Sequence, residues 1–208
     1  MQMSRRKMVK IAAGAGSALA LGAAGGASAA GEAEQTDRTS PETLIIDDFN
    51  AIPMATIGGQ WSYVSDRVMG GVSQGKAAYE TVDDRRSIRL EGDVSTANNG
   101  GFIQVSLRLD PRALNAEDYA GIEIDVLGNG ESYNVHLTTT RSFPPWRFYK
   151  HSFPTTGTWT RLQLPWADFT SDTFRRPLDP STINRMNLTA YARDFAADLS
   201  VSRIALYR

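Results

Sequence analysis

Apolar and polar residues alternate with a period of two along most of the chain after residue 40. The clearest examples, in which every second residue is apolar, are 103–109, 122–126, 133–137 and 186–190. Such alternation predicts β-strands with one buried and one exposed face. No segment keeps a helical apolar period, so only short helical turns are expected, near 111–119 and 179–183. In the last alternating segment the apolar phase shifts, which indicates a β-bulge near Ser202 or Arg203.

Turn-forming residues, mostly glycine, asparagine and proline, separate the alternating segments. They lie at 58–59, 70–71, 98–101, 128–130, 144–145 and 156–157. Glycine and asparagine tolerate left-handed backbone, and proline cannot continue a strand ladder, so these residue types form tight turns. Many short strands joined by such turns are typical of an antiparallel sandwich. The sequence therefore predicts an all-β, jelly-roll β-sandwich as one domain, 41–208.

The first thirty residues differ from the rest of the chain. They contain four basic residues and no acidic one, and then an uncharged run rich in alanine and glycine that ends on a small-x-small pattern at 27–29. This order indicates an export signal, and the pair Arg5 and Arg6 resembles the twin-arginine type. We therefore expect a signal peptide at 1–30, a flexible polar tether at 31–40 and a periplasmic or secreted protein. An uncleaved membrane anchor is the alternative, but glycines and serines make the run a poor span.

The leader hides the charge of the domain that follows it. The whole chain of 208 residues has a formal charge of −1. Without the four basic residues of the leader, 18 of the 22 basic residues remain against 23 acidic ones, a net charge of about −5. Such a domain is not expected to bind nucleic acid. The chain has no cysteine, two histidines and no nucleotide-binding or zinc-protease motif, so we expect no metal and no cofactor. No other stretch is apolar enough to span a membrane after leader cleavage.

Two motifs are distinctive: 61–73, with the sequence WSYVSDRVMGGVS, and 98–102, with the sequence NNGGF. With 119–122, 159–169 and 174–177, they resemble the complex I intermediate-associated protein 30 family over about 44–207. The motif positions are Trp61, Ser65, Asp66, Arg67, Met69, Gly70, Gly71, Ser73, Asn98, Asn99, Gly100, Gly101 and Phe102. The resemblance implies a galactose-binding-like jelly roll without catalytic activity. Because mitochondrial members are assembly factors for NADH:ubiquinone oxidoreductase, it also implies an assembly or maturation role for a protein complex, here one of the cell envelope.

Residues 71–75, with the sequence GVSQG, also match the Gly-x-Ser-x-Gly motif of serine hydrolases. His136 or His151 could then act as the base for a Ser73 nucleophile. That motif needs a strand before the serine and a helix after it, whereas here a glycine loop precedes it and an alternating segment follows. A turn whose serine caps backbone groups fits better. A secreted serine hydrolase is therefore the second alternative function.

Asp66 and the pair Asp47 and Asp48 are carboxylates beside loops. Each could bind calcium, which takes oxygen ligands, or Asp66 could pin its loop by pairing with an arginine. The spaced acids of an EF-hand loop are missing, which favours the structural role for Asp66. Asn98 and Asn99 also have two interpretations, a left-handed turn or amides that hydrogen-bond sugar hydroxyls, and we favour the turn.

Nine of the nineteen aromatic residues lie within 32 residues, around the stretch 141–149. Core packing is expected for most of them, but this stretch mixes aromatics with arginine and proline. Trp146 and Phe148 share one strand face, and Arg147 and Tyr149 share the other. One of the two pairs must therefore face outward.

The polar faces of 134–138 and 187–191 complete a candidate binding surface. Aromatic rings stack on the apolar faces of sugars, and amides and hydroxyls bind sugar hydroxyls. The candidate ligand-binding residues are His136, Thr138, Arg141, Trp146, Tyr149, Asn187 and Tyr191. The partner would be a protein complex or a glycan, so a carbohydrate-binding module is the first alternative function.

Overall fold

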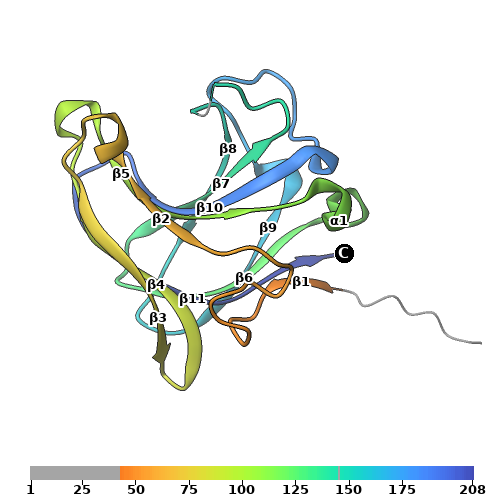
Figure 1. Ribbon diagram of the computed structural model, residues 1–208, viewed down its shortest axis with the longest axis horizontal. Coiled ribbons are helices and arrows are strands. Elements are labelled where there is room, and N and C mark those ends of the chain that lie inside the picture. The colour runs from red at the N-terminus through yellow and green to blue at the C-terminus, as the bar shows by residue number, and fades with distance from the viewer. Residues whose placement is uncertain (1–42, 145) are drawn as a thin grey trace, which may run out of the picture. The chain divides into compact units, whose positions relative to one another are not determined.

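The computed structural model describes residues 43–144 and 146–208. The expected signal peptide, the tether and the alternative of a membrane anchor lie outside these residues. The described chain forms two sheets that pack face to face (Figure 1). All strand pairings in both sheets are antiparallel. This arrangement confirms the predicted all-β sandwich of the jelly-roll type.

The larger sheet has six strands in the order β3-β4-β11-β6-β9, with β1 added beside β11. Its strands are β1 (Thr43–Asp47), β3 (Gln74–Val82), β4 (Arg85–Val94), β6 (Gly121–Gly128), β9 (Thr160–Pro165) and β11 (Phe195–Tyr207). The smaller sheet has five strands in the order β2-β5-β10-β7-β8. They are β2 (Ser62–Ser65), β5 (Phe102–Arg108), β7 (Ser132–Thr139), β8 (Tyr149–Pro154) and β10 (Ile183–Tyr191). The late strand β10 thus lies at the centre of the smaller sheet.

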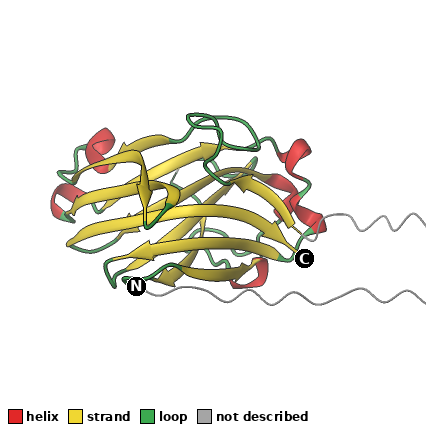
Figure 2. Cartoon of the chain, turned by 90° about the horizontal axis from the view of Figure 1, so that it is seen from below, coloured by secondary structure: helices red, strands yellow, loops and turns green. Residues whose placement is uncertain are grey.

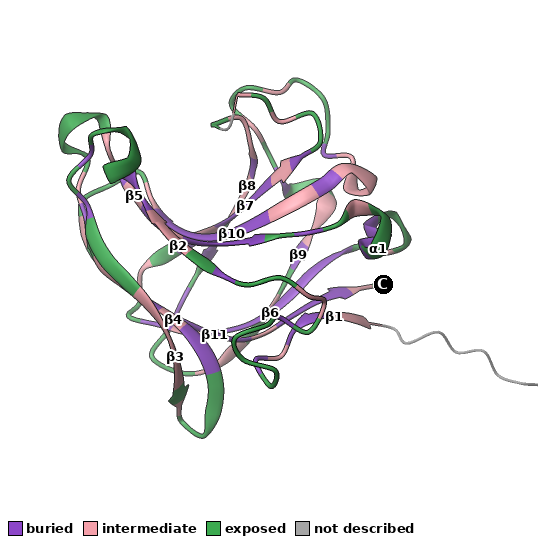
Figure 3. Ribbon diagram, in the orientation of Figure 1, coloured by how far each residue is buried: buried purple, intermediate pink, exposed green. Residues whose placement is uncertain are grey.

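Alternate residues of both sheets fill the space between them, as the period-two pattern predicts. Leu90 and Ile122 of one sheet and Leu107 of the other are at most 1% exposed and belong to one core cluster. Buried segments run along the strands, and exposed ones gather in the connections (Figure 3). The register between β11 and β6 shifts between Val201 and Arg203, which confirms the predicted bulge.

Short helical turns lie at the ends of the strands (Figure 2). They are α1 (Pro111–Leu114) and the 3-10 helices η1 (Asp66–Met69), η2 (Ala97–Asn99), η3 (Ala116–Asp118), η4 (Trp166–Asp168) and η5 (Pro180–Thr182). Asp110 caps α1 by accepting the N–H of Arg112 at 3.0 Å, and proline occupies the first turn. Both expected helical stretches are confirmed. Over 43–144 and 146–208, no helix is long and apolar enough to span a membrane.

Candidate functional site

Asp66 joins the two distinctive motifs. Its carboxylate is fully buried and accepts the N–H of Ser73 at 3.0 Å and the N–H of Gly101 at 2.6 Å. It also accepts the N–H of Phe102 at 3.2 Å and the hydroxyl of Ser73 at 2.5 Å. Burial alone would raise the pKa of Asp66, but these hydrogen bonds outweigh it and hold the pKa below the ordinary 3.8. This arrangement, here called the Asp66 clasp, ties the loop after β2 to the turn before β5.

Two glycines of the motifs make room for the Asp66 clasp. A Cβ atom on Gly71 would lie 2.3 Å from Asp66 Cγ, and one on Gly100 would lie 2.4 Å from Asp66 Oδ2. Asn98 and Asn99 have φ angles of 57° and 59°, in the left-handed region that asparagine tolerates. These asparagines therefore form the expected left-handed turn. Asp66 does pin its loop, but through backbone N–H groups rather than through an arginine.

Asp47 and Asp48 are also surrounded by hydrogen-bond donors. Buried Asp47 accepts the indole N–H of Trp61 at 2.8 Å. Asp48 accepts the side-chain amide of Asn50 and the hydroxyl of Thr56, each at 2.9 Å. Donors that point at a carboxylate compete with a cation for the same oxygens. In the part of the chain that the structure describes, no three acidic or histidine side chains gather as metal ligands do.

Ser73 does not have the surroundings of a hydrolase nucleophile. It is fully buried, its hydroxyl donates to Asp66, and its oxygen accepts the N–H of Ser95 at 2.9 Å. Strand β3 follows it directly, whereas a nucleophile elbow is followed by a helix. Among the described residues neither His136 nor His151 hydrogen-bonds Ser73, so the Gly-x-Ser-x-Gly match is better explained as part of the Asp66 clasp.

The outer face of the five-stranded sheet points away from the six-stranded sheet. Its residues alternate with core residues such as Val105, Leu188 and Val135. Strand pairing aligns them in three rows across the sheet: Val64-Gln104-Thr189-Asn134-Ser152, then Ser62-Ser106-Asn187-His136-Lys150, then Arg108-Arg185-Thr138. Every one of these side chains except that of Val64 is polar. The outer face is therefore polar along its strands, but Ser106, His136, Asn187 and Thr189 at its centre are at most 5% exposed.

Loops at both ends of the five-stranded sheet rise beside the outer face (Figure 1). At one end, the turn η1 exposes Val68 and Met69, which are 76% and 58% accessible. At the other end, the connection from β7 to β8 exposes Phe143 and Trp146, which are 81% and 63% accessible. Large apolar side chains exposed on both loops are typical of interaction surfaces.

His136 and Asn187 lie at the centre of the outer face. The His136 ring stacks on Phe148 with centroids 4.1 Å apart and meets Tyr191 edge-on at 4.9 Å. Burial, together with the charge of Lys150, lowers the pKa of His136 to about 3, so its imidazole is neutral. The Nε2 atom of His136 and the Oδ1 atom of Asn187 are buried without a hydrogen-bond partner in the described residues. Such atoms are costly in a folded protein and would gain from a partner that reached them.

Six of the seven candidate ligand residues lie on the outer face or on the loop beside it. His136, Thr138 and Asn187 belong to the three rows, and Tyr191 is the last residue of β10 and contacts His136. Arg141 and Trp146 lie on the connection from β7 to β8.

Tyr149 is the exception, and the structure corrects its expected place on the surface. Its side chain is 6% exposed and belongs to the core cluster, opposite Leu137 of β7. The ring stacks on Phe174 at 5.0 Å, and the hydroxyl donates to the carbonyl of Arg176 at 3.2 Å. Of the two pairs on 141–149, the one with Phe148 therefore faces outward.

Sequence reasoning did not select Gln104, Ser106, Arg108 or Arg185, which the structure places on the outer face. All four occupy the polar phase of their strands, which places them on the outer face, although Ser106 is only 2% exposed there. Their contacts with one another could not be predicted from the sequence, because the contacting residues are far apart in it. Arg185, for example, donates to the hydroxyl of Ser106 at 3.2 Å, and the two residues are 79 positions apart.

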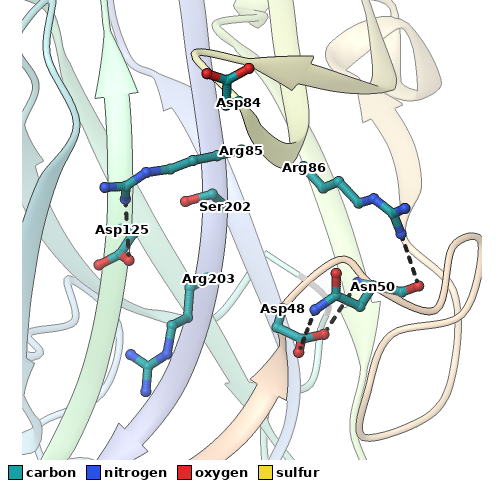
Figure 4. A pocket seen from close by; sticks show the side chains of 8 residues that line it. All are labelled: Asp48, Asn50, Asp84, Arg85, Arg86, Asp125, Ser202 and Arg203. Carbon is teal, nitrogen blue, oxygen red and sulfur yellow. Dashed lines mark hydrogen bonds and ion pairs between the residues drawn. The ribbon is translucent and has the colours of Figure 1, made fainter. Parts of the chain in front are cut away.

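A separate hollow of about 430 Å³ lies over the six-stranded sheet (Figure 4). It is lined by Arg85, Arg86, Arg203 and the carboxylates of Asp48, Asp84 and Asp125, among others. Arg85 lies 3.6 Å from Asp125, and Arg86 donates to the carbonyl of Asn50 at 3.3 Å. Arg203 pairs with Glu123. Each arginine thus has an acceptor of its own, so the hollow offers control positions rather than a second site.

The sequence profile of the family Complex I intermediate-associated protein 30 (CIA30) matches residues 55–201. The matched range includes both distinctive motifs and therefore the whole Asp66 clasp. No curated protein sequence matches the chain.

Solved structures with a similar fold include carbohydrate-binding modules. A family 11 module from Clostridium thermocellum, in complex with a β-1,3-1,4-mixed-linked tetrasaccharide, has a TM-score of 0.63 at 14% identity, over 79% of this chain and 95% of the module. The family 11 module of the cellulase Lic26A-Cel5E of the same organism has a TM-score of 0.63 at 13% identity, over 79% and 94%. A family 30 module has a TM-score of 0.54 at 13% identity, over 80% and 99%. At these identities the likeness is one of fold.

Proposed function

The chain belongs to the complex I intermediate-associated protein 30 family, and we propose that it is an exported, non-catalytic protein that binds a glycan chain on the outer face of its five-stranded sheet. The family and the fold support a binding domain without catalytic activity. The leader supports export. The glycan is the ligand that fits the chemistry of the outer face best.

One observation carries the proposal: unpartnered polar atoms and aromatic rings meet at the centre of the outer face. Asn187 Oδ1 and His136 Nε2 are buried and have no hydrogen-bond partner among the described residues, and the rings of Phe148 and Tyr191 lie against His136. Sugar rings present apolar C–H faces for stacking and hydroxyls for hydrogen bonds. A neutral imidazole can exchange hydrogen bonds with hydroxyls without the cost of a buried charge.

The size of the outer face suits an extended ligand. Five strands at about 4.8 Å spacing make it about 19 Å wide, and rows two residues apart make it about 13 Å long. Polar side chains, apart from Val64, fill two rows across all five strands and a third row across β5, β10 and β7. A polymer of several sugar rings would use it better than one small molecule, as the tetrasaccharide bound to a family 11 module of similar fold also suggests.

Titration calorimetry of the purified protein against a panel of neutral and acidic polysaccharides tests the proposal. We expect binding to at least one polysaccharide, and about tenfold weaker binding for Tyr191→Ala and Phe148→Ala, because each removes an aromatic contact. Arg86→Ala, in the hollow over the six-stranded sheet, is the control and should bind as the wild type does. Binding to no polysaccharide, or equal loss in Arg86→Ala, would contradict the proposal.

A second candidate function is docking to a protein complex of the envelope during its assembly or maturation. The observation that favours it is the apolar turn η1 with Val68 and Met69, which are exposed although the Asp66 clasp holds the turn in place. Crosslinking and pull-down from envelope fractions, with the variant Val68→Asp/Met69→Asp as control, tests this candidate. A defined complex that is recovered with the wild type and lost with the variant would support it. Recovery of the same proteins with both would count against it.

A further inference from the structure

Charge is distributed unevenly between the two sheets. The strands of the six-stranded sheet hold seven acidic and six basic residues. The strands of the five-stranded sheet hold no acidic residue and three basic ones, Arg108, Lys150 and Arg185. The domain has a net negative charge, so a sheet whose only charged strand residues are basic calls for an explanation.

Arg108 and Arg185 stand directly opposite each other on β5 and β10. Like charges in this position repel and weaken the pairing of the two strands. Arg185 is also half-buried, so burial and the charge of Arg108 lower the pKa of its guanidinium. The pair therefore costs folding free energy instead of contributing to it.

No carboxylate in the described part of the chain compensates the charge of this arginine pair. Of the ion pairs among residues 43–144 and 146–208, none includes Arg108 or Arg185. Arg185 has a neutral acceptor, the hydroxyl of Ser106 at 3.2 Å. Lys150, the third basic residue of these strands, differs because it pairs with Asp172 at 2.7 Å.

The two arginines continue the polar rows of the outer face. Arg185 is aligned with Thr138 in its row, and Ser106 and Asn187 lie one row further. The Oδ1 atom of Asn187 has no hydrogen-bond partner within 43–144 and 146–208. Arginine is the side chain best shaped for a carboxylate or sulfate, because its planar fork donates two parallel hydrogen bonds. An anion between the two guanidinium groups would also remove their mutual repulsion.

We propose that the outer face binds an acidic polysaccharide, and that Arg108 and Arg185 hold the carboxylate or sulfate groups of its sugar units. This inference rests on the proposed function and names the substrate class of the same site. A polymer with a repeated charge uses the arginine pair and the polar rows together, whereas an isolated anion would use only the pair.

The test compares affinities for a polyuronate, a sulfated polysaccharide and a neutral mixed-linkage β-glucan at low and high salt. We expect the acidic polymers to bind more tightly than the neutral one, and more weakly as salt is added. Arg185→Gln and Arg108→Gln should each lower affinity for the acidic polymer about tenfold, the loss of a charge-assisted hydrogen bond. Arg86→Gln, from the hollow over the other sheet, should leave it unchanged. The acidic polymer that shows this arginine dependence identifies the anion as carboxylate or sulfate.

Three results would overturn the inference. If the protein prefers the neutral glucan and Arg185→Gln binds with the affinity of the wild type, the inference of an acidic ligand is wrong, but the proposed glycan binding is retained. Equally tight, arginine-dependent binding of polyglutamate would assign the face to an acidic protein segment instead. A thermal unfolding midpoint of Arg108→Gln below that of the wild type would mean that the arginine pair serves the fold. Binding to no polysaccharide at all would instead remove the proposed function, so the two failures are distinguishable.

Discussion

Replacing Asp66 by alanine removes the acceptor of four hydrogen bonds at once. Its carboxylate is fully buried and receives the N–H groups of Ser73, Gly101 and Phe102 and the Ser73 hydroxyl. The hydroxyl can turn to the carbonyl of Ser95, which already lies 3.2 Å away. The three backbone N–H groups have no such substitute, so the variant leaves them buried and unpaired.

The size of the effect follows from those three donors. A buried donor without a partner costs about 1–3 kcal/mol, and water entry and relaxation recover part of the sum. We therefore expect Asp66→Ala to lower the free energy of unfolding by about 3–5 kcal/mol. Asp66→Asn keeps the size of the side chain but turns one acceptor into a donor, so it should recover only part of the loss.

Urea unfolding of the wild type and of these variants measures the loss, with Ser73→Ala and the double variant closing a double-mutant cycle. Asp48→Ala is the matched control, because this half-buried carboxylate accepts side-chain hydrogen bonds from Asn50 and Thr56, and its loss should cost less than about 1 kcal/mol. If Asp66→Ala folds, its free energy of unfolding should be lower than that of Asp48→Ala.

The pKa of Asp66 adds a check on the sign of the effect. Hydrogen bonds hold the pKa of Asp66 below 3.8 in spite of its burial, so the contribution of the Asp66 clasp is present above pH 3.8 and is lost as the pH falls through the lower folded value. The stability gap between wild type and Asp66→Ala should therefore narrow in acid. A gap below about 0.5 kcal/mol at neutral pH, or one that widens in acid, would refute the reasoning.

Three further predictions concern other parts of the chain. Trp61→Phe removes the donor to Asp47 Oδ2, at 2.8 Å, and should cost about 1–2 kcal/mol in urea unfolding; a change below about 0.3 kcal/mol would contradict this. The pKa of His136 is lowered from 6.5 to about 3, so the unfolded state takes up the proton first. Stability should then fall by up to about 1.4 kcal/mol per pH unit below 6.5 in the wild type and not in His136→Gln; equal pH profiles would refute it. Lysines in place of Arg5 and Arg6 should keep the protein in the cytoplasm, as cell fractionation would show, whereas unchanged export would exclude the twin-arginine route.

The sandwich could be predicted from sequence because each strand carries its own pattern. Ile103, Val105 and Leu107 alternate with polar residues, and the structure buries all three. Neighbouring strands could not be predicted in the same way, because pairing is decided by the packing of the whole sheet. Residues Gln104 and Thr189, whose side chains hydrogen-bond at 3.3 Å, are 85 positions apart. The outer face therefore emerges only once β10 lies between β5 and β7.

Tyr149 illustrates where local pattern misleads. A tyrosine in a polar, arginine-rich stretch suggests a surface residue, but β8 begins at Tyr149 and its phase is set by Phe153, which is 1% exposed. Counting back by twos from Phe153 places Tyr149 inside and Phe148 outside. The Asp66 clasp could be predicted only in part. The sequence predicts that Asp66 holds its loop, but the pattern of side chains does not indicate that the partners are backbone N–H groups.

The two sheets use arginine for opposite purposes, which separates stability from binding. On the six-stranded sheet, Arg89 donates to both oxygens of Asp198, at 2.8 and 2.9 Å, and Arg161 donates to both oxygens of Asp125, at 2.7 and 2.9 Å. Both bidentate pairs link neighbouring strands, and the hydrogen bonds from Arg161 lower the pKa of Asp125. On the five-stranded sheet, Arg185 pairs with no carboxylate of the described residues. Substitutions of Arg161 should therefore change stability, whereas those of Arg185 should change affinity with the fold intact.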